Sequence, residues 1–102
     1  MTAVGAVDDF ADGSARRVDV DGIPVCVVRL GDEFYAIADT CSHADFSLSD
    51  GDVWAETCEI ECPKHGATFS LRDGQPQTLP ATQPVAVFDV TVRDDLVEVR
   101  AR

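Results

Sequence analysis

The chain has 102 residues, of which 45% are apolar, and its formal net charge is −11. This length suits one domain, residues 1–102, built around one hydrophobic core. The strong negative charge argues against nucleic acid and anionic membranes as partners. It favours a basic docking surface on another protein, although a requirement for solubility alone would also explain it.

No apolar run approaches the ~20 residues that a membrane-spanning helix needs. The amino terminus also lacks the basic-then-apolar order of a signal peptide. We therefore expect a cytoplasmic protein with no membrane partner.

Short strands with frequent turn signals are predicted along the first part of the chain. Four segments are involved: residues 1–12, 15–20, 24–30 and 33–38. The first is an edge segment in which Val4, Val7 and Phe10 face the core. Asp21-Gly22 is a strong hairpin signal between the next two strands.

The same pattern continues after a predicted turn at residues 49–52. Further strands are predicted over residues 53–54, 59–60, 68–71, 85–92 and 96–100. Trp54, in the first of these, is expected to pack in the core or as a lid rather than to contact a partner. Many short strands without helical periodicity predict an all-β fold, an antiparallel sandwich or incomplete barrel in which helix is nearly absent.

Two Cys-His pairs stand out between these strands, Cys41-Ser42-His43 and Cys62-Pro63-Lys64-His65. Two thiolates and two imidazoles suit either an iron-sulfur cluster or a tetrahedral zinc site. A zinc finger usually groups its cysteines together and its histidines together, whereas here the two kinds alternate. The spacing therefore favours a cluster of two irons, with Cys41 and Cys62 on one iron and His43 and His65 on the other.

The pattern Cys-x-His, followed by Cys-Pro-x-His-Gly-x-x-Phe ending at Phe69, resembles the Rieske [2Fe-2S] family. Asp73-Gly74 and Leu79-Pro80-Ala81 are similar to that family's flanking turn and to the proline loop that shields the cluster. The resemblance implies one Rieske-type [2Fe-2S] cluster per chain, bound by Cys41, His43, Cys62 and His65. It also implies a small cluster-binding subdomain, at about residues 40–75, inserted between two strands of the main sheet.

Two cysteines lie outside the ligand pattern. Cys26 is expected to be a small buried hydrophobe, and Cys58 a buried strand residue rather than an alternative ligand. Respiratory Rieske proteins cross-link their cluster loops by two further cysteines, and Phe46 and Lys64 stand at those places here. We therefore expect no loop disulfide, consistent with a reducing compartment.

The chain has only two histidines, so if both bind iron none remains as a catalytic base, and no glycine-rich nucleotide fingerprint is present. These features predict an electron carrier that is not an enzyme by itself. High-potential Rieske proteins place serine and tyrosine hydroxyls just after the second loop, where this chain has Ala67 and Phe69. It is therefore similar to the low-potential ferredoxins of aromatic-ring dioxygenases.

The resemblance implies a soluble carrier, a monomer or weak oligomer, between two protein partners. It would take electrons from a flavin-dependent reductase and pass them to a terminal non-haem iron oxygenase. Two alternatives share the same ligands: the small Rieske subunit of a larger oxidoreductase such as nitrite reductase, and a Rieske protein associated with iron-sulfur assembly.

Overall fold

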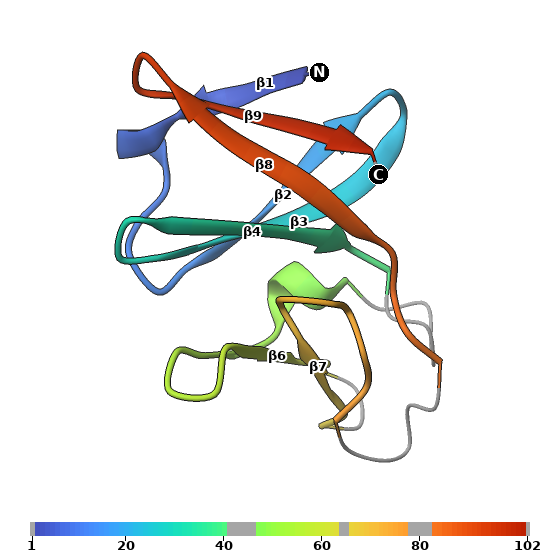
Figure 1. The fold of residues 1–102 in the computed structure, drawn as a ribbon. Helices are drawn as coiled ribbons and strands as arrows, with labels where there is room; N and C mark the ends of the chain where they lie inside the picture. Colours follow the sequence, from blue (N-terminus) through green and yellow to red (C-terminus); the bar gives the residue numbers. More distant parts are fainter. Residues whose placement is uncertain (1, 41–46, 64–65, 78–82, 102) are drawn as a thin grey trace.

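A computed structural model describes residues 2–40, 47–63, 66–77 and 83–101 of the chain. Within these residues the strands form two antiparallel sheets (Figure 1). The large sheet has six strands in the order β1 (Thr2–Ala6), β9 (Leu96–Ala101), β8 (Val87–Arg93), β4 (Glu33–Ala38), β3 (Ile23–Leu30) and β2 (Ala15–Val20). The small sheet has three strands in the order β5 (Val53–Trp54), β6 (Glu59–Glu61) and β7 (Thr68–Ser70).

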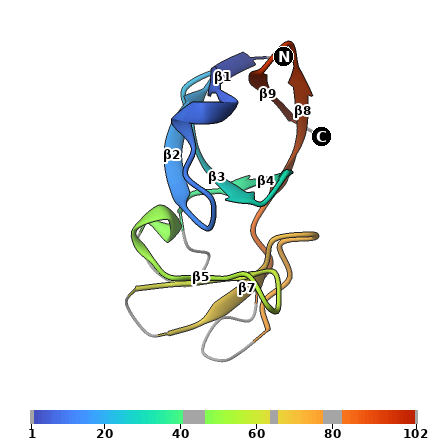
Figure 2. The same ribbon diagram turned by 90° about the vertical axis from the view of Figure 1, so that its left-hand side faces the viewer.

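The large sheet curls into an incomplete barrel, as expected. Figure 2 shows its six strands arranged around a closed-in interior, and the outer strands β1 and β2 contact each other where the barrel nearly closes. Helix is confined, in the described part of the chain, to two short 3₁₀ turns, η1 (Val7–Asp9) and η2 (Leu48–Asp50). None of the helices described there is long and apolar enough to cross a membrane.

The small sheet is an insertion between β4 and β8, as the family resemblance implied. It lies against one side of the barrel, together with η2 (Figures 1 and 2). β4 leads into the insertion and β8 follows it. The two strands pair with each other through Ala36↔Phe88 and Ile37↔Val87. The insertion therefore begins and ends at neighbouring points of the barrel.

Strand β3 is buried on both faces because successive side chains of a strand point to opposite sides. Val25 and Val27 face the barrel interior, whereas Cys26 and Val28 face the small sheet, and all four are fully buried. Two hydrophobic clusters result, which we call the barrel core and the junction core. The barrel core consists of Phe10, Val20, Val25, Val27, Ala36, Phe88, Val97 and Val99. The junction core consists of Cys26, Val28, Ile37, Leu48, Cys58, Ile60, Cys62, Ala67, Phe69, Leu71 and Val85.

The predicted hairpin at Asp21-Gly22 is confirmed. Both residues have positive φ, 53° and 82°, as a two-residue turn between twisted antiparallel strands requires. The predicted edge segment is also present, as β1 followed by η1, and Phe10 after it is buried against Phe34 with the two rings edge to face at 5.7 Å.

Two predicted strands are shorter than expected. The segment predicted for residues 85–92 becomes a strand only at Val87, because the Val85 backbone N–H donates to Gly74 O at 2.9 Å instead of to a strand. The segment predicted for residues 68–71 ends at Ser70, and the N–H of Leu71 donates to Cys58 O at 2.9 Å. The first bond joins the segment before β8 to the turn at Gly74, and the second joins the residue after β7 to the turn at Cys58.

Candidate metal centre

The predicted ligands belong to the two predicted loops of the insertion, and the described residues that flank each loop are joined by backbone pairing. Thr40 and Ser47 form an isolated antiparallel bridge around the first loop. The N–H of Cys62 donates to Ala67 O at 2.7 Å around the second loop, and the N–H of Gly66 donates to Cys62 O at 3.1 Å. Gly66 has φ 74°, a conformation that favours glycine and that allows this tight turn.

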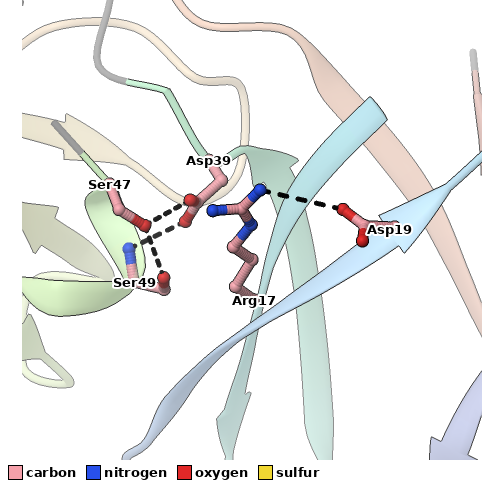
Figure 3. A network of polar contacts seen from close by, with 5 residues as sticks. All are labelled: Arg17, Asp19, Asp39, Ser47 and Ser49. Carbon is pink, nitrogen blue, oxygen red and sulfur yellow. Dashed lines mark hydrogen bonds and ion pairs between the residues drawn. The ribbon is translucent and has the colours of Figure 1, made fainter. Parts of the chain in front are cut away.

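A buried carboxylate holds the base of the first loop. Asp39, 2% exposed, accepts hydrogen bonds from the hydroxyl of Ser47 and, at 2.9 Å, from the N–H of Ser49 (Figure 3). Its backbone carbonyl also accepts from the N–H of Leu48 at 2.6 Å. Since hydrogen bonds to a charged group contribute about 1.5–3 kcal/mol each, this network fixes where η2 stands relative to the end of β4.

The two loop bases meet in the same place. Leu48, which follows the first loop, and Cys62 and Ala67, which bound the second, are all fully buried members of the junction core. The thiol of Cys62 is thus held in an apolar setting beneath the barrel strands. Of the four predicted ligands only Cys62 lies within the described residues, and Cys41, His43 and His65 lie outside them.

Cys26 is the buried hydrophobe that the sequence predicted. Burial in the junction core raises the pKa of its thiol strongly, and the nearby charge of Asp39 raises it further. Cys26 therefore fills space in the junction core as a small apolar side chain.

Cys58 is buried, as predicted, but it is not in a strand. It lies in the turn between β5 and β6 with φ 56°, and it is 5% exposed. The pKa of Arg72 is raised, chiefly by hydrogen bonding to this thiol. The pKa of Tyr35 in β4 is raised first by its hydrogen bond to Glu33, then by burial, and also by the nearby thiol of Cys58. Cys58 therefore lies close to β4, a position that its neighbours in the sequence do not reveal.

The expectation that Trp54 packs in the core was wrong. Its side chain belongs to neither hydrophobic core of the described residues, and the residue is 47% exposed. Trp54 is paired with Glu59 in the β5–β6 ladder, on the face opposite to Ile60, and Ile60 and its partner Phe69 fill the junction core instead. Two-residue strands carry too short an alternation for the sequence to identify the inward face.

The fold and the two loops allow a comparison with known proteins. The family model for the Rieske [2Fe-2S] domain matches residues 1–89. The chain belongs to the Rieske [2Fe-2S] family. Its cofactor is accordingly one Rieske-type cluster, whose donor set of two cysteines and two histidines this chain can supply.

Individual Rieske proteins resemble the chain over nearly its whole length. Ferredoxin CarAc of Metapseudomonas resinovorans is 43% identical over 94% of this chain and 89% of the relative. The ferredoxin of carbazole 1,9a-dioxygenase from Nocardioides aromaticivorans IC177 is 42% identical, with a TM-score of 0.97 over 99% of this chain and 97% of that one.

A solved complex of a ferredoxin with its oxygenase also contains a chain similar to this one. In a complex of reduced oxygenase and oxidized ferredoxin in carbazole 1,9a-dioxygenase, the matched chain is 42% identical. Its TM-score is 0.90, over 97% of this chain and 91% of that one.

Proposed function

We propose that this chain is the ferredoxin component of an aromatic-ring dioxygenase system, a one-electron carrier and not an enzyme by itself. It receives electrons from a flavin-dependent reductase and gives them to a terminal non-haem iron oxygenase. The observation that carries this proposal is the full-length likeness to ferredoxins of such systems, at 42–43% identity and a TM-score up to 0.97. The free thiols of Cys26 and Cys58 suit a reducing compartment such as the cytoplasm.

The proposal assigns the four motif residues as cluster ligands. Cys41 and Cys62 bind one iron, and His43 and His65 bind the other. The bound cluster supplies one-electron chemistry by changing its oxidation state. Support comes from the complete burial of Cys62 and from the two closed loops that meet in the junction core.

The other residues of the site hold these ligands and set their surroundings. Asp39, Ser47 and Ser49 fix the base of the first loop. Ala67 and Phe69, both fully buried just after the second loop, offer no hydroxyl there. Both histidines of the chain are ligands, so no imidazole remains for proton transfer to a substrate.

Ligand substitution tests the cluster assignment. Alanine at Cys41, His43, Cys62 or His65 is expected to abolish the visible and EPR spectra of the reduced protein, because the remaining residues cannot complete the donor set. Cys26→Ala and Cys58→Ser are the matched controls, since they remove a buried thiol outside the motif and should keep the cluster. Zinc without sulfide in anaerobically purified protein, or loss of the cluster in Cys58→Ser, would contradict the assignment.

Stopped-flow mixing tests the carrier role. The reduced chain is mixed with the oxidised terminal oxygenase of carbazole 1,9a-dioxygenase from Nocardioides aromaticivorans, and cluster reoxidation is followed by absorbance. We expect second-order oxidation without a third component, and a monomer in light scattering. A chain that always co-purifies with a large subunit would instead support the role of a nitrite reductase subunit.

A further inference from the structure

The single tryptophan of the chain stands on the surface of the insertion. Trp54 is 47% exposed, although tryptophan is among the side chains that gain most from burial. The other large apolar side chains of similar exposure in the described residues, Ile23, Val92 and Leu96, all belong to the large sheet. Among the described residues of the insertion, Trp54 is thus the large exposed apolar side chain, and its exposure calls for an explanation.

The indole is oriented toward the second ligand loop. Its Nε1–H donates to Oε1 of Glu61 at 3.2 Å, along the diagonal between neighbouring strands. Glu61 directly precedes Cys62. The other carboxylate oxygen of Glu61 would lie 3.9 Å from a Cβ placed on Gly66, the residue that closes the same loop. The hydrogen bond to Glu61 therefore places the indole beside the residue that precedes Cys62.

Negative charge lies beside the indole, on its cross-strand partner Glu59 and its hydrogen-bond acceptor Glu61, and further carboxylates are close to it in the sequence. Residues 47–63 contain no lysine or arginine, and they carry the carboxylates of Asp50, Asp52, Glu56, Glu59 and Glu61. The first three are exposed and the last two are half-buried. An exposed aromatic side chain with charged, solvated neighbours fits the anatomy of a protein interface, in which tryptophan is a frequent hot spot.

Trp54 contributes little to the fold by comparison. Ile60 and Phe69, on the other face of the small sheet, are fully buried and pack this sheet into the junction core. The polar contact of the indole is with Glu61, whose half-exposed carboxylate water can also solvate. A smaller side chain at this position should leave the core and both loop bases intact.

We propose that Trp54 anchors the docking surface for the terminal oxygenase. The indole enters an apolar pocket of the oxygenase, and the acidic side chains around it meet lysine and arginine side chains at the rim of that pocket. Contact at Trp54 brings the second ligand loop near the partner, because the indole is hydrogen-bonded to Glu61, the residue directly before Cys62. This inference rests on the proposed function, since it presupposes an oxygenase partner.

The test compares two truncations of equally exposed apolar residues. Trp54→Ala is expected to raise the dissociation constant for the carbazole dioxygenase oxygenase at least tenfold, measured by calorimetry, and to raise the KM for the ferredoxin likewise. Leu96→Ala, 46% exposed on β9 of the barrel, is the control and should bind like the wild type. Trp54→Phe keeps an aromatic ring but loses the indole N–H, so its dissociation constant should lie between those of Trp54→Ala and Leu96→Ala.

Two further readouts separate docking from an effect on the cluster. The midpoint potential and melting temperature of Trp54→Ala should equal those of the wild type. The chain labelled with 5-fluorotryptophan gives one ¹⁹F resonance, which should shift or broaden when unlabelled oxygenase is added.

Equal affinities of Trp54→Ala and Leu96→Ala, or an unchanged ¹⁹F resonance in the complex, would overturn the docking inference and leave the proposed function standing. A changed potential in Trp54→Ala would show that the indole acts through the cluster instead, which also overturns it. An oxygenase that accepts no electrons from the wild-type chain would contradict the proposed function itself.

Discussion

At the scale of single residues, two apolar side chains define the polarity of the second ligand loop. Ala67 and Phe69 are both fully buried, and the Ala67 carbonyl already accepts the N–H of Cys62. Hydrogen bonds to the sulfurs of a cluster favour the reduced state and raise the potential. Two positions that carry hydroxyls in high-potential Rieske proteins therefore carry no donor side chain here, and we expect a midpoint near the low end of the family range, roughly −150 mV.

Restoring the hydroxyls should raise that potential. A hydrogen bond to a charged group contributes about 1.5–3 kcal/mol, which corresponds to about 65–130 mV for one electron. Ala67→Ser and Phe69→Tyr are each expected to shift the midpoint upward by up to this amount in protein-film voltammetry. Phe34→Tyr, which adds a hydroxyl in β4, is the matched control and should cause no shift. A wild-type midpoint above about +100 mV would mean that other donors control the cluster.

At the scale of elements, the insertion depends on a close approach of two backbones. Gly51 follows η2, and a Cβ added to it would lie 1.7 Å from the carbonyl oxygen of Glu61 and 3.3 Å from that of Leu48. Gly51 has φ −89°, so glycine is required here for space and not for its backbone conformation. At this contact the backbone of Gly51, which follows the first ligand loop, packs directly against the end of β6, which leads into Cys62.

Gly51→Ala should therefore separate these two segments. We expect a loss of at least 1–3 kcal/mol in the free energy of unfolding, the usual cost of overpacking, together with a lower cluster content after purification. Thermal unfolding and iron analysis measure both. Gly13→Ala is the comparison, because its added Cβ meets nothing within 4 Å although its φ is 77°; it should cost about 1–2 kcal/mol and keep the cluster. Equal cluster content in the two variants would show that the Gly51 contact does not support the second loop.

At the scale of the whole molecule, the dominant physical property is charge. The formal net charge of −11 on 102 residues produces a field that extends well beyond the contact surface. A basic partner is attracted by this field before any side chain touches it. Salt shortens the range of the attraction to about 10 Å at 0.1 M and about 3 Å at 1 M.

Electron transfer to a basic partner should consequently slow as salt is added. We expect the second-order rate constant for oxidation by the oxygenase to fall at least tenfold between about 0.02 M and 0.5 M salt in stopped-flow experiments. Oxidation by an uncharged quinone should change little over the same range. A rate constant for the oxygenase that is independent of salt would remove electrostatic steering and leave the cluster assignment untouched.

The sequence by itself determined the features that depend on neighbouring residues. The hairpin at Asp21-Gly22, the alternation along the strands and the grouping of two Cys-His pairs are local patterns, so they predicted the all-β fold and the family correctly. The Val-rich run of β3 predicted a strand. It could not show that one face would fill the barrel and the other the junction core, because that depends on what lies above each face.

Only the tertiary structure decided where the residues of the insertion stand. Trp54 is apolar and was expected inside, but Ile60 and Phe69 occupy the inner face of the small sheet and leave the indole on the outer one. Cys58 was expected in a strand, but it lies in a left-handed turn that Arg72 and Tyr35 contact from other elements. The physical reason is the same in both cases. In strands of two or three residues, contacts with distant parts of the chain outweigh the local pattern, and those contacts exist only once the barrel has formed.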